Sequence, residues 1–108
     1  MTSREAGQPA DPPIETGVYQ CLADVVIRNK KGLHSRASAL FAKCAERYDA
    51  EIRVTKDDMS ANGGSILGLL MLAADKGSTI TIVTEGQEAE DAIDALVALV
   101  ENKFNEDE

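Results

Sequence analysis

The first half of the folded chain changes its hydrophobic period near residue 34. Before that point, apolar residues recur at every second position, which is the spacing of a half-buried β-strand, and the inward-facing set is Cys21, Ala23, Val25 and Ile27. Asn29–Gly32 is typical of a loop. From Ser35 onward the apolar residues follow helical spacing, and those expected on one helical face are Ala37, Leu40, Phe41, Cys44 and Tyr48.

A hairpin is expected after this helix. Ile52 and Val54 alternate with charged neighbours and predict a second strand. Asp57-Asp58 is typical of a turn, and Met59–Ala61 predicts a short third strand that ends at two glycines. The second and third strands should therefore pair with each other directly.

The last third of the chain predicts another helix, a strand and a final helix. Ser65 is placed to cap a short, very apolar helix over Ile66–Leu72. Ile80 and Ile82 alternate with threonines in a fourth strand, and Glu85-Gly86 is typical of a turn. The final helix has acidic residues at its N-terminal end, and its apolar stripe is Ala89, Ala92, Ile93, Leu96, Leu99 and Val100.

The resulting order, βαββαβα with short hairpins, predicts the α+β class: an antiparallel sheet with helices on one face. Residues 1–17 hold all three prolines and show no apolar period, so we expect a disordered tail. Residues 18–108 then form one domain, because 108 residues are too few for two. Aromatic residues make up only 4 % of the chain, so the core must be aliphatic.

Charge is distributed unevenly. The net charge is −8, and residues 85–108 hold nine acidic residues and one basic residue. We interpret the acidic last helix as a solvent-exposed face and assign it no site. Residues 25–45 hold five basic residues and no acidic one, which favours contact with a phosphate or an acidic partner surface. Nucleic-acid binding is not expected of so acidic a chain without aromatic residues among the basic ones.

Other composition features narrow the class of protein. We see no apolar run long enough to span a membrane and no signal peptide, so we expect a soluble, cytoplasmic monomer without membrane insertion. Cys21 and Cys44 are expected to be reduced core residues, not a disulfide framework. The chain lacks the cysteine and histidine spacing of metal sites, and we expect neither a metal nor a cofactor.

The only histidine of the chain, His34, lies where the loop ends and the first helix begins. The free N–H groups of a helix's first turn, together with the helix dipole, favour an anion at this position. Arg36 adds a guanidinium, and an imidazole that is neutral near pH 7 is a nucleophile. This arrangement suits an imidazole that accepts and releases a phosphoryl group. A histidine that only caps a surface helix is the alternative.

Two motifs stand out in the sequence, one at Gly32–Ser38 and one at Gly64–Leu72. Both resemble those of a known family, the HPr phosphocarrier proteins of the bacterial phosphoenolpyruvate-dependent phosphotransferase system. The family's phosphohistidine signature resembles Gly32-Leu33-His34-Ser35-Arg36-Ala37-Ser38. Its regulatory serine and the short helix after it resemble Gly64–Leu72. The resemblance covers about Val18 to Glu106, including the strand Gly77–Thr84 and a last helix that continues to Phe104.

The resemblance implies an open-faced sandwich, in which a four-stranded antiparallel sheet carries three helices on one face. It implies that His34 is phosphorylated on the ring nitrogen facing the helix start, and that Arg36 stabilises the transferring phosphoryl group. The donor would be the phosphohistidine of Enzyme I, and the acceptor a histidine of an EIIA-type protein. Such a protein is a carrier and not an enzyme.

Ser65 is a second candidate site. In some members of the family an HPr kinase/phosphorylase modifies the corresponding serine and so suppresses transfer at the histidine, and we assign this role to Ser65 as a hypothesis. A serine that only caps the helix is the alternative. The helix after it is too apolar to bury every side chain in a small core, so we expect an exposed docking patch for partners. The expected members of this docking patch are Ser35, Ala39, Ile66, Leu67, Leu70 and Met71.

Three other functions stay open. The protein would also fit as the carrier of the nitrogen-related regulatory branch of the same system, in place of sugar transport. It would fit as a regulatory adaptor that binds partners through the Ser65 helix whether or not His34 is phosphorylated. A small-ligand-binding α+β module with an incidental histidine is the third possibility.

Overall fold

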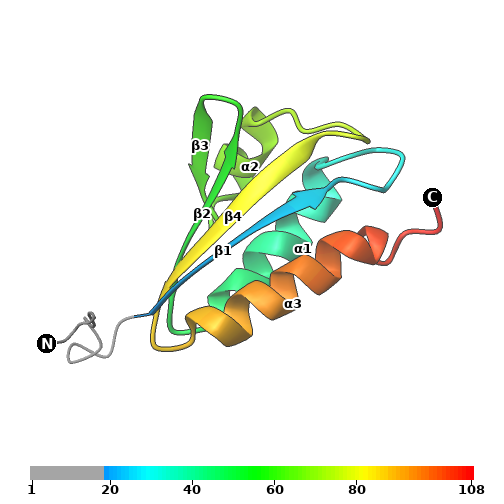
Figure 1. The fold of residues 1–108 in the computed structure, drawn as a ribbon. Helices are drawn as coiled ribbons and strands as arrows, with labels where there is room; N and C mark the ends of the chain where they lie inside the picture. The colour runs from blue at the N-terminus through cyan, green and yellow to red at the C-terminus, as the bar shows by residue number, and fades with distance from the viewer. Residues whose placement is uncertain (1–18) are drawn as a thin grey trace, which may run out of the picture.

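The computed structural model describes residues 19–108, so the predicted tail at residues 1–17 lies outside the described residues (Figure 1). Four strands and three helices follow one another in the predicted order, and a short 3₁₀ turn comes after the last helix. The elements are β1 (Tyr19–Val26), α1 (Ser35–Glu46), β2 (Glu51–Lys56), β3 (Met59–Asn62), α2 (Ile66–Met71), β4 (Thr79–Gly86), α3 (Ala89–Glu101) and η2 (Lys103–Asn105).

The four strands form one antiparallel sheet in the order β1-β4-β2-β3, so β4 lies inside the sheet although it is the last strand in the sequence. Ile82 of β4 pairs with Ala23 of β1 on one side and with Val54 of β2 on the other. Val54 in turn pairs with Ala61 of β3. This row crosses the sheet on its inner side, where Val54 and Ile82 are fully buried. The apolar positions of all four strands therefore face the core in register.

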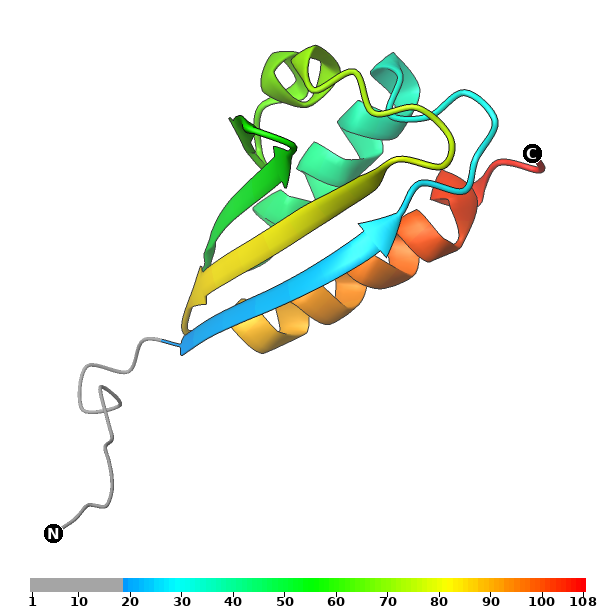
Figure 2. The same ribbon diagram turned by 45° about the horizontal axis from the view of Figure 1, so that its top comes forward.

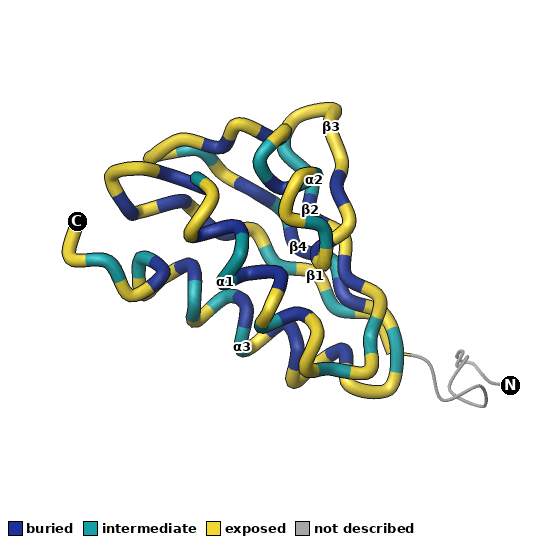
Figure 3. The backbone as a smooth tube through the Cα atoms, turned by 180° about the vertical axis from the view of Figure 1, so that it is seen from behind, coloured by how far each residue is buried: buried dark blue, intermediate teal, exposed yellow. Residues whose placement is uncertain are grey.

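The three helices cover one face of the sheet and leave the other face open (Figures 1 and 2). Helices α1 and α3 lie side by side against the sheet, and α2 packs against α1 and β3. Figure 3 shows buried residues concentrated between the two layers, and the core is aliphatic apart from Phe41 and Phe104. The α+β open-faced sandwich is confirmed. Among the described residues, no helix is both long enough and apolar enough to span a membrane.

The turn predicted at Glu85-Gly86 was wrong, because β4 continues through both residues. Glu85 pairs with Gln20 and Glu51, and Gly86 pairs with Tyr19. Gly86 has a φ of +137°, and a Cβ there would lie 3.0 Å from backbone atoms of Asp49 and Ala50, which directly precede β2. The glycine therefore lets the end of β4 lie close to the backbone that leads into β2, and the turn comes after it.

The last helix ends earlier than the family resemblance implied. Helix α3 stops at Glu101, and Lys103, Phe104 and Asn105 have left-handed backbone angles, with φ of 58°, 53° and 64°. Such angles are unfavourable for non-glycine residues. Burial of the Phe104 ring, which is 0 % exposed, offsets this cost. The chain thus leaves the helix axis, and residues 106–108 lie beside the loop that precedes α1 (Figure 2).

Helix α1 turns a slightly different face to the core than predicted. Ala37 and Phe41 are buried as expected, but Leu40, Cys44 and Tyr48 are only half-buried. The rest of the buried face consists of small residues, namely Ser38, Ala42 and Ala45. Small side chains let a helix approach its neighbours closely. A prediction that selects the buried face of a helix by hydrophobicity alone misses such residues.

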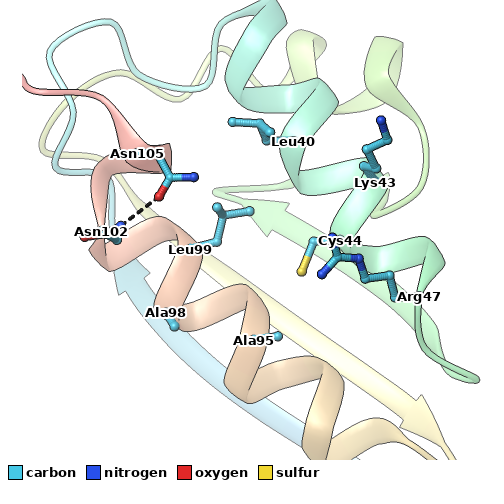
Figure 4. Close-up of a pocket in the computed structure, with 9 residues that line it drawn as sticks. All are labelled: Leu40, Lys43, Cys44, Arg47, Ala95, Ala98, Leu99, Asn102 and Asn105. Carbon is cyan, nitrogen blue, oxygen red and sulfur yellow. Dashed lines mark hydrogen bonds between the residues drawn. The ribbon is translucent and has the colours of Figure 1, made fainter.

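A groove of about 470 Å³ lies between α1 and α3, where these half-buried side chains meet solvent (Figure 4). Leu40 and Cys44 line it from α1, and Leu99 lines it from α3. Cys21 is also half-buried, so neither cysteine is the full core residue that the sequence predicted. Burial raises the pKa of the Cys44 thiol, although nearby Arg47 acts to lower it. A raised pKa keeps this group a thiol at neutral pH.

We expect Phe104→Ala to lower the free energy of unfolding by about 3–5 kcal/mol, because it removes a fully buried ring and leaves a cavity. Urea denaturation measures this change. Leu67→Ala is the control, since that side chain is 68 % exposed and its loss should cost less than about 0.5 kcal/mol. Equal losses in the two variants would show that Phe104 does not anchor the C-terminal segment.

Candidate functional site

The loop between β1 and α1 is held by the segment that precedes β4. The Leu33 N–H donates to the Ala74 carbonyl at 2.8 Å. Gly32 has a φ of +67°, and a Cβ there would lie 2.4 Å from the Ala74 oxygen, so no larger residue fits without moving the backbone. The loop therefore delivers His34 to one fixed place, the N-cap of α1.

The hydrogen bonds of His34 define which ring nitrogen carries the proton. Nδ1 accepts from the backbone N–H of Arg36 at 3.3 Å, which is the capping bond of α1. Because a backbone N–H can only donate, Nδ1 holds a lone pair, and the proton of the neutral ring is on Nε2. The side chain is 25 % exposed, so the ring is supported on one side and open on the other.

Glu106 supplies the partner of that proton. Its Oε2 lies 2.5 Å from Nε2 of His34 and also accepts from Nη1 of Arg36 at 3.2 Å. The Glu106 side chain is 14 % exposed. Burial acts to raise the pKa of this carboxyl, but the hydrogen bonds from His34 and Asn29, with the charge of Arg36, bring it below its ordinary value. Glu106 is thus a carboxylate at neutral pH.

Asn29 adds two more hydrogen bonds to the network around His34 and Glu106. Its side-chain amide donates to Oε1 of Glu106 at 3.1 Å and to the carbonyl of Gly32 at 2.8 Å. The residue is fully buried, and its Oδ1 has no hydrogen-bond partner within residues 19–108. Asn29 therefore joins the loop to Glu106 through its side-chain amide.

Basic residues surround the imidazole, as the charge pattern predicted. Lys30, Lys31 and Arg36 line a pocket of about 180 Å³ together with His34, and the same pocket contains two carboxylates, Glu106 and Glu108. The Lys30 N–H donates to the Glu108 carbonyl at 2.5 Å, which holds the end of the chain in place.

This arrangement can stabilise a negatively charged group that becomes bonded to Nδ1. The first-turn N–H groups of α1 have no intrahelical partners, and the helix dipole stabilises a negative charge there by roughly 0.3–1 kcal/mol. The Arg36 side chain is 59 % exposed, which leaves it free to turn toward a bound anion. A lone pair, oriented donors and a movable guanidinium are the requirements of a phosphoryl acceptor.

Comparison with known proteins agrees with this chemistry. The family model for the PTS HPr component phosphorylation site matches residues 22–102. The chain belongs to the HPr family. Phosphocarrier protein NPr of Shewanella violacea is 48 % identical over 82 residues, which cover 76 % of this chain and 90 % of that protein. Phosphocarrier protein HPr of Cupriavidus necator is 41 % identical over 85 residues, covering 79 % and 96 %.

Solved HPr structures share the fold. The crystal structure of HPr-C-His from Thermoanaerobacter tengcongensis matches with a TM-score of 0.78 at 39 % identity, covering 82 % of this chain and 99 % of that one. HPr-family proteins are phosphocarriers of bacterial phosphotransferase systems and not enzymes. The family expected from the sequence is therefore confirmed, and so is the expectation of a carrier protein.

The second predicted site of this HPr-family protein lies on α2. Ser65 is its N-cap, and Oγ accepts from the Gly68 N–H at 3.0 Å. Within residues 19–108, no hydrogen bond or ion pair joins Ser65 to His34 or Arg36. The two sites are therefore separate, although their helices pack together.

The docking patch predicted around α2 is partly exposed. Ile66, Leu67 and Met71 are exposed by 44 %, 68 % and 62 %. Leu70 is half-buried, while Leu69 and the C-cap residue Leu72 are buried and hold the helix to the core. On α1, Ser35 is exposed and Ala39 is half-buried.

Sequence analysis missed Asn29 and Glu106. The sequence places Asn29 in a loop, where asparagine is common, and the acidic last helix is assigned no site. The acids of the helix itself are indeed exposed, but Glu106 lies 72 positions from its partner His34, too far for any local period to connect them. Phe104 was the available signal, because an aromatic residue beyond the last helical stripe indicates an anchored chain end.

We expect the contribution of Glu106 to stability to disappear in acid. Its folded-state pKa is lowered, so the contribution is present above the ordinary value of 4.5 and is lost as the pH falls through the folded-state value. Glu106→Gln should be less stable than the wild type at pH 7, and the difference should shrink below pH 4.5. Thermal unfolding across this range measures it.

Glu108→Gln is the matched control for this titration. Its ion pair with Lys30 is about three-quarters exposed on both sides, so the substitution should change little at any pH. A stability difference for Glu106→Gln that stays constant from neutral to acid pH would contradict the account of its carboxylate.

Proposed function

We propose that this protein carries a phosphoryl group on Nδ1 of His34, taking it from the phosphohistidine of Enzyme I and passing it to a histidine of an EIIA-type protein. The observation that supports this proposal best is the position of Nδ1, whose lone pair lies at the N-terminus of α1. Family membership supports it as well, because the matching family model is that of a phosphorylation site.

Arg36 is proposed to stabilise the phosphoryl group during transfer. In the unphosphorylated protein its guanidinium contacts Glu106. A phosphoryl group on Nδ1 would lie at the helix start, beside the Arg36 backbone, and it carries more charge than the carboxylate. Charge-assisted hydrogen bonds to it are worth about 1.5–3 kcal/mol. The exposed side chain can therefore exchange one partner for the other without rearranging the helix.

Partners are proposed to bind through the docking patch. Its exposed members, Ile66, Leu67 and Met71, lie on α2, which packs against the helix that His34 begins. An apolar surface of this kind marks an interaction site. A carrier must exchange partners quickly, which fits a small interface better than an extensive one.

Ser65 is proposed as a regulatory phosphorylation site. Its Oγ lies at the start of α2, directly before Ile66 of the docking patch. A phosphate there would add close to two negative charges beside an apolar surface, and the desolvation of that charge would oppose partner binding. An HPr kinase/phosphorylase is the enzyme class that would place it.

Which branch of the phosphotransferase system this carrier serves is decided by the EIIA-type protein that accepts its phosphoryl group. Relatives of similar identity carry the names HPr and NPr, so sequence similarity favours neither the sugar branch nor the nitrogen-related branch. Transfer to purified EIIA-type proteins of each branch, compared at equal concentration, separates the two.

We expect phosphoenolpyruvate, Mg²⁺ and Enzyme I to place an acid-labile, alkali-stable phosphate on the wild-type protein and none on His34→Ala. Arg36→Ala should slow labelling by at least about tenfold, from the loss of a charge-assisted contact. Lys43→Ala is the matched control, because it removes a basic residue of α1 at the far end of the helix and should label normally. Failure of the wild type to label with Enzyme I of either branch would contradict the carrier proposal and favour the adaptor.

We expect Leu67→Asp to raise the KM for phospho-Enzyme I without altering the site at His34. Leu22→Asp is the matched control, since Leu22 is exposed by 66 %, against 68 % for Leu67, but lies on the open face of the sheet. Ser65→Asp should act like Leu67→Asp, whereas Ser65→Asn keeps an N-cap without the charge and should act like the wild type. Equal effects of the Leu67 and Leu22 substitutions would contradict the docking patch.

A further inference from the structure

We propose that Glu106 is a positioning residue for phosphoryl transfer, because it holds the proton of His34 on Nε2 and so keeps the lone pair on Nδ1. This inference rests on the proposed function, in which Nδ1 is the nucleophile. It adds a residue from the opposite end of the chain to a site that the sequence places entirely at the start of α1.

Two independent contacts assign the ring nitrogens. The carboxylate of Glu106 can only accept, so Nε2, at 2.5 Å, donates to it. The backbone N–H of Arg36 can only donate, so Nδ1 accepts from it. Both contacts favour the same tautomer and the same orientation of the ring. Such a carboxylate–imidazole pair fixes the tautomer by orienting the second nitrogen.

Glu106 is itself held from several sides. Oε1 accepts from the buried amide of Asn29, and Oε2 accepts from Arg36. On either side of Glu106 along the chain, Phe104 is fully buried and the Glu108 carbonyl accepts from the Lys30 N–H. A carboxylate placed by so many contacts is part of the site and does not belong to a loose acidic end.

The retained Nε2 proton matters in both directions of transfer. When the phosphoryl group arrives, the Nδ1 lone pair forms the new N–P bond while the P–N bond of the donor breaks, and the ring becomes a cation that the Glu106 carboxylate stabilises. When the group leaves, the electron pair of the P–N bond returns to Nδ1. Since Nε2 is still protonated, the ring leaves as neutral imidazole. Without that proton it would leave as imidazolate, which is a far poorer leaving group.

A competing effect has the opposite sign. The same carboxylate occupies Arg36 and repels an incoming phosphoryl group, so its removal would favour transfer if these terms were larger. The hydrogen bond to Nε2 is short and direct, whereas the phosphoryl group attaches to the other nitrogen of the ring. Arg36 is also exposed and can turn away from Glu106. Positioning should therefore outweigh repulsion.

Three variants test the proposal: Glu106→Ala, Glu106→Gln and the control Asp107→Ala, which removes an exposed carboxylate outside the His34 pocket. The first readout is ¹⁵N NMR of the His34 ring at about pH 8.5, where imidazole is neutral; it needs no Enzyme I. The wild type should show one tautomer, with the proton on Nε2. Glu106→Ala should show a mixture of tautomers. Glu106→Gln, which keeps an acceptor oxygen, should remain close to the wild type, as should Asp107→Ala.

The second readout is steady-state transfer from phospho-Enzyme I. We expect Glu106→Ala to lower kcat by about tenfold with little change in KM, the size of one lost charge-assisted hydrogen bond. Glu106→Gln should recover part of this loss. Backbone amide spectra of α1 show whether each variant is folded, and Glu106→Gln keeps the packing of the C-terminal segment if Glu106→Ala does not.

An unchanged tautomer in both Glu106 variants, or a kcat equal to or above that of the wild type, would overturn the positioning role. A faster Glu106→Ala would instead show that competition for Arg36 dominates. Failure of the wild type to accept phosphate from Enzyme I would reject the proposed function, and with it the role of Glu106 in transfer. The tautomer measurement would still report whether Glu106 orients the ring.

Discussion

The hydrogen bond between the Glu106 carboxylate and Nε2 of His34 joins the last residues of the chain to the start of its first helix, across 72 positions. It forms only if both ends are placed accurately. Gly32 lets the loop before α1 approach the Ala74 carbonyl, and burial of Phe104 turns the chain away from the axis of α3. The aliphatic core thereby contributes to the geometry of one imidazole ring, because it places both segments that the hydrogen bond joins.

Local patterns predicted most of the fold. Alternation identified β1, β2 and β4, helical spacing identified α1 and α3, and Ser65 was recognised as an N-cap, all of which depend on neighbours within a few residues. The errors arose where distant segments meet. Gly86 was predicted to lie in a turn, since the sequence does not show that Asp49 and Ala50, just before β2, lie close to it. Leu40 and Cys44 were predicted to face the core, but α1 turns its smaller residues inward instead.

The candidate site divides in the same way. His34 and Arg36 were predicted because they are two positions apart in sequence and lie in a basic segment. Asn29 and Glu106 were not, because their relation to His34 exists only in three dimensions. The candidate site therefore has a local half, which supplies the proposed nucleophile at the helix start, and a distant half, which contacts the ring through Glu106.

The two halves suit a carrier better than a catalyst. The backbone around His34 is held by hydrogen bonds, while Arg36 and three side chains of α2 (Ile66, Leu67 and Met71) are exposed. The proposed nucleophile would therefore stay in place as partners change. No deep cleft is needed, because the second reacting group arrives on another protein. Within residues 19–108 no hydrogen bond joins Ser65 to His34, so the proposed regulation at Ser65 would act on partner binding without a change in the ring itself.

The measurement that tests this account most directly is NMR of the phosphorylated, ¹⁵N-labelled protein, which identifies the ring nitrogen bonded to phosphorus through its ³¹P–¹⁵N coupling. The account predicts a coupling to Nδ1 of His34 and a proton on Nε2. A coupling to Nε2, or phosphate on another residue, would contradict it, because Nε2 is the nitrogen that the structure directs at Glu106.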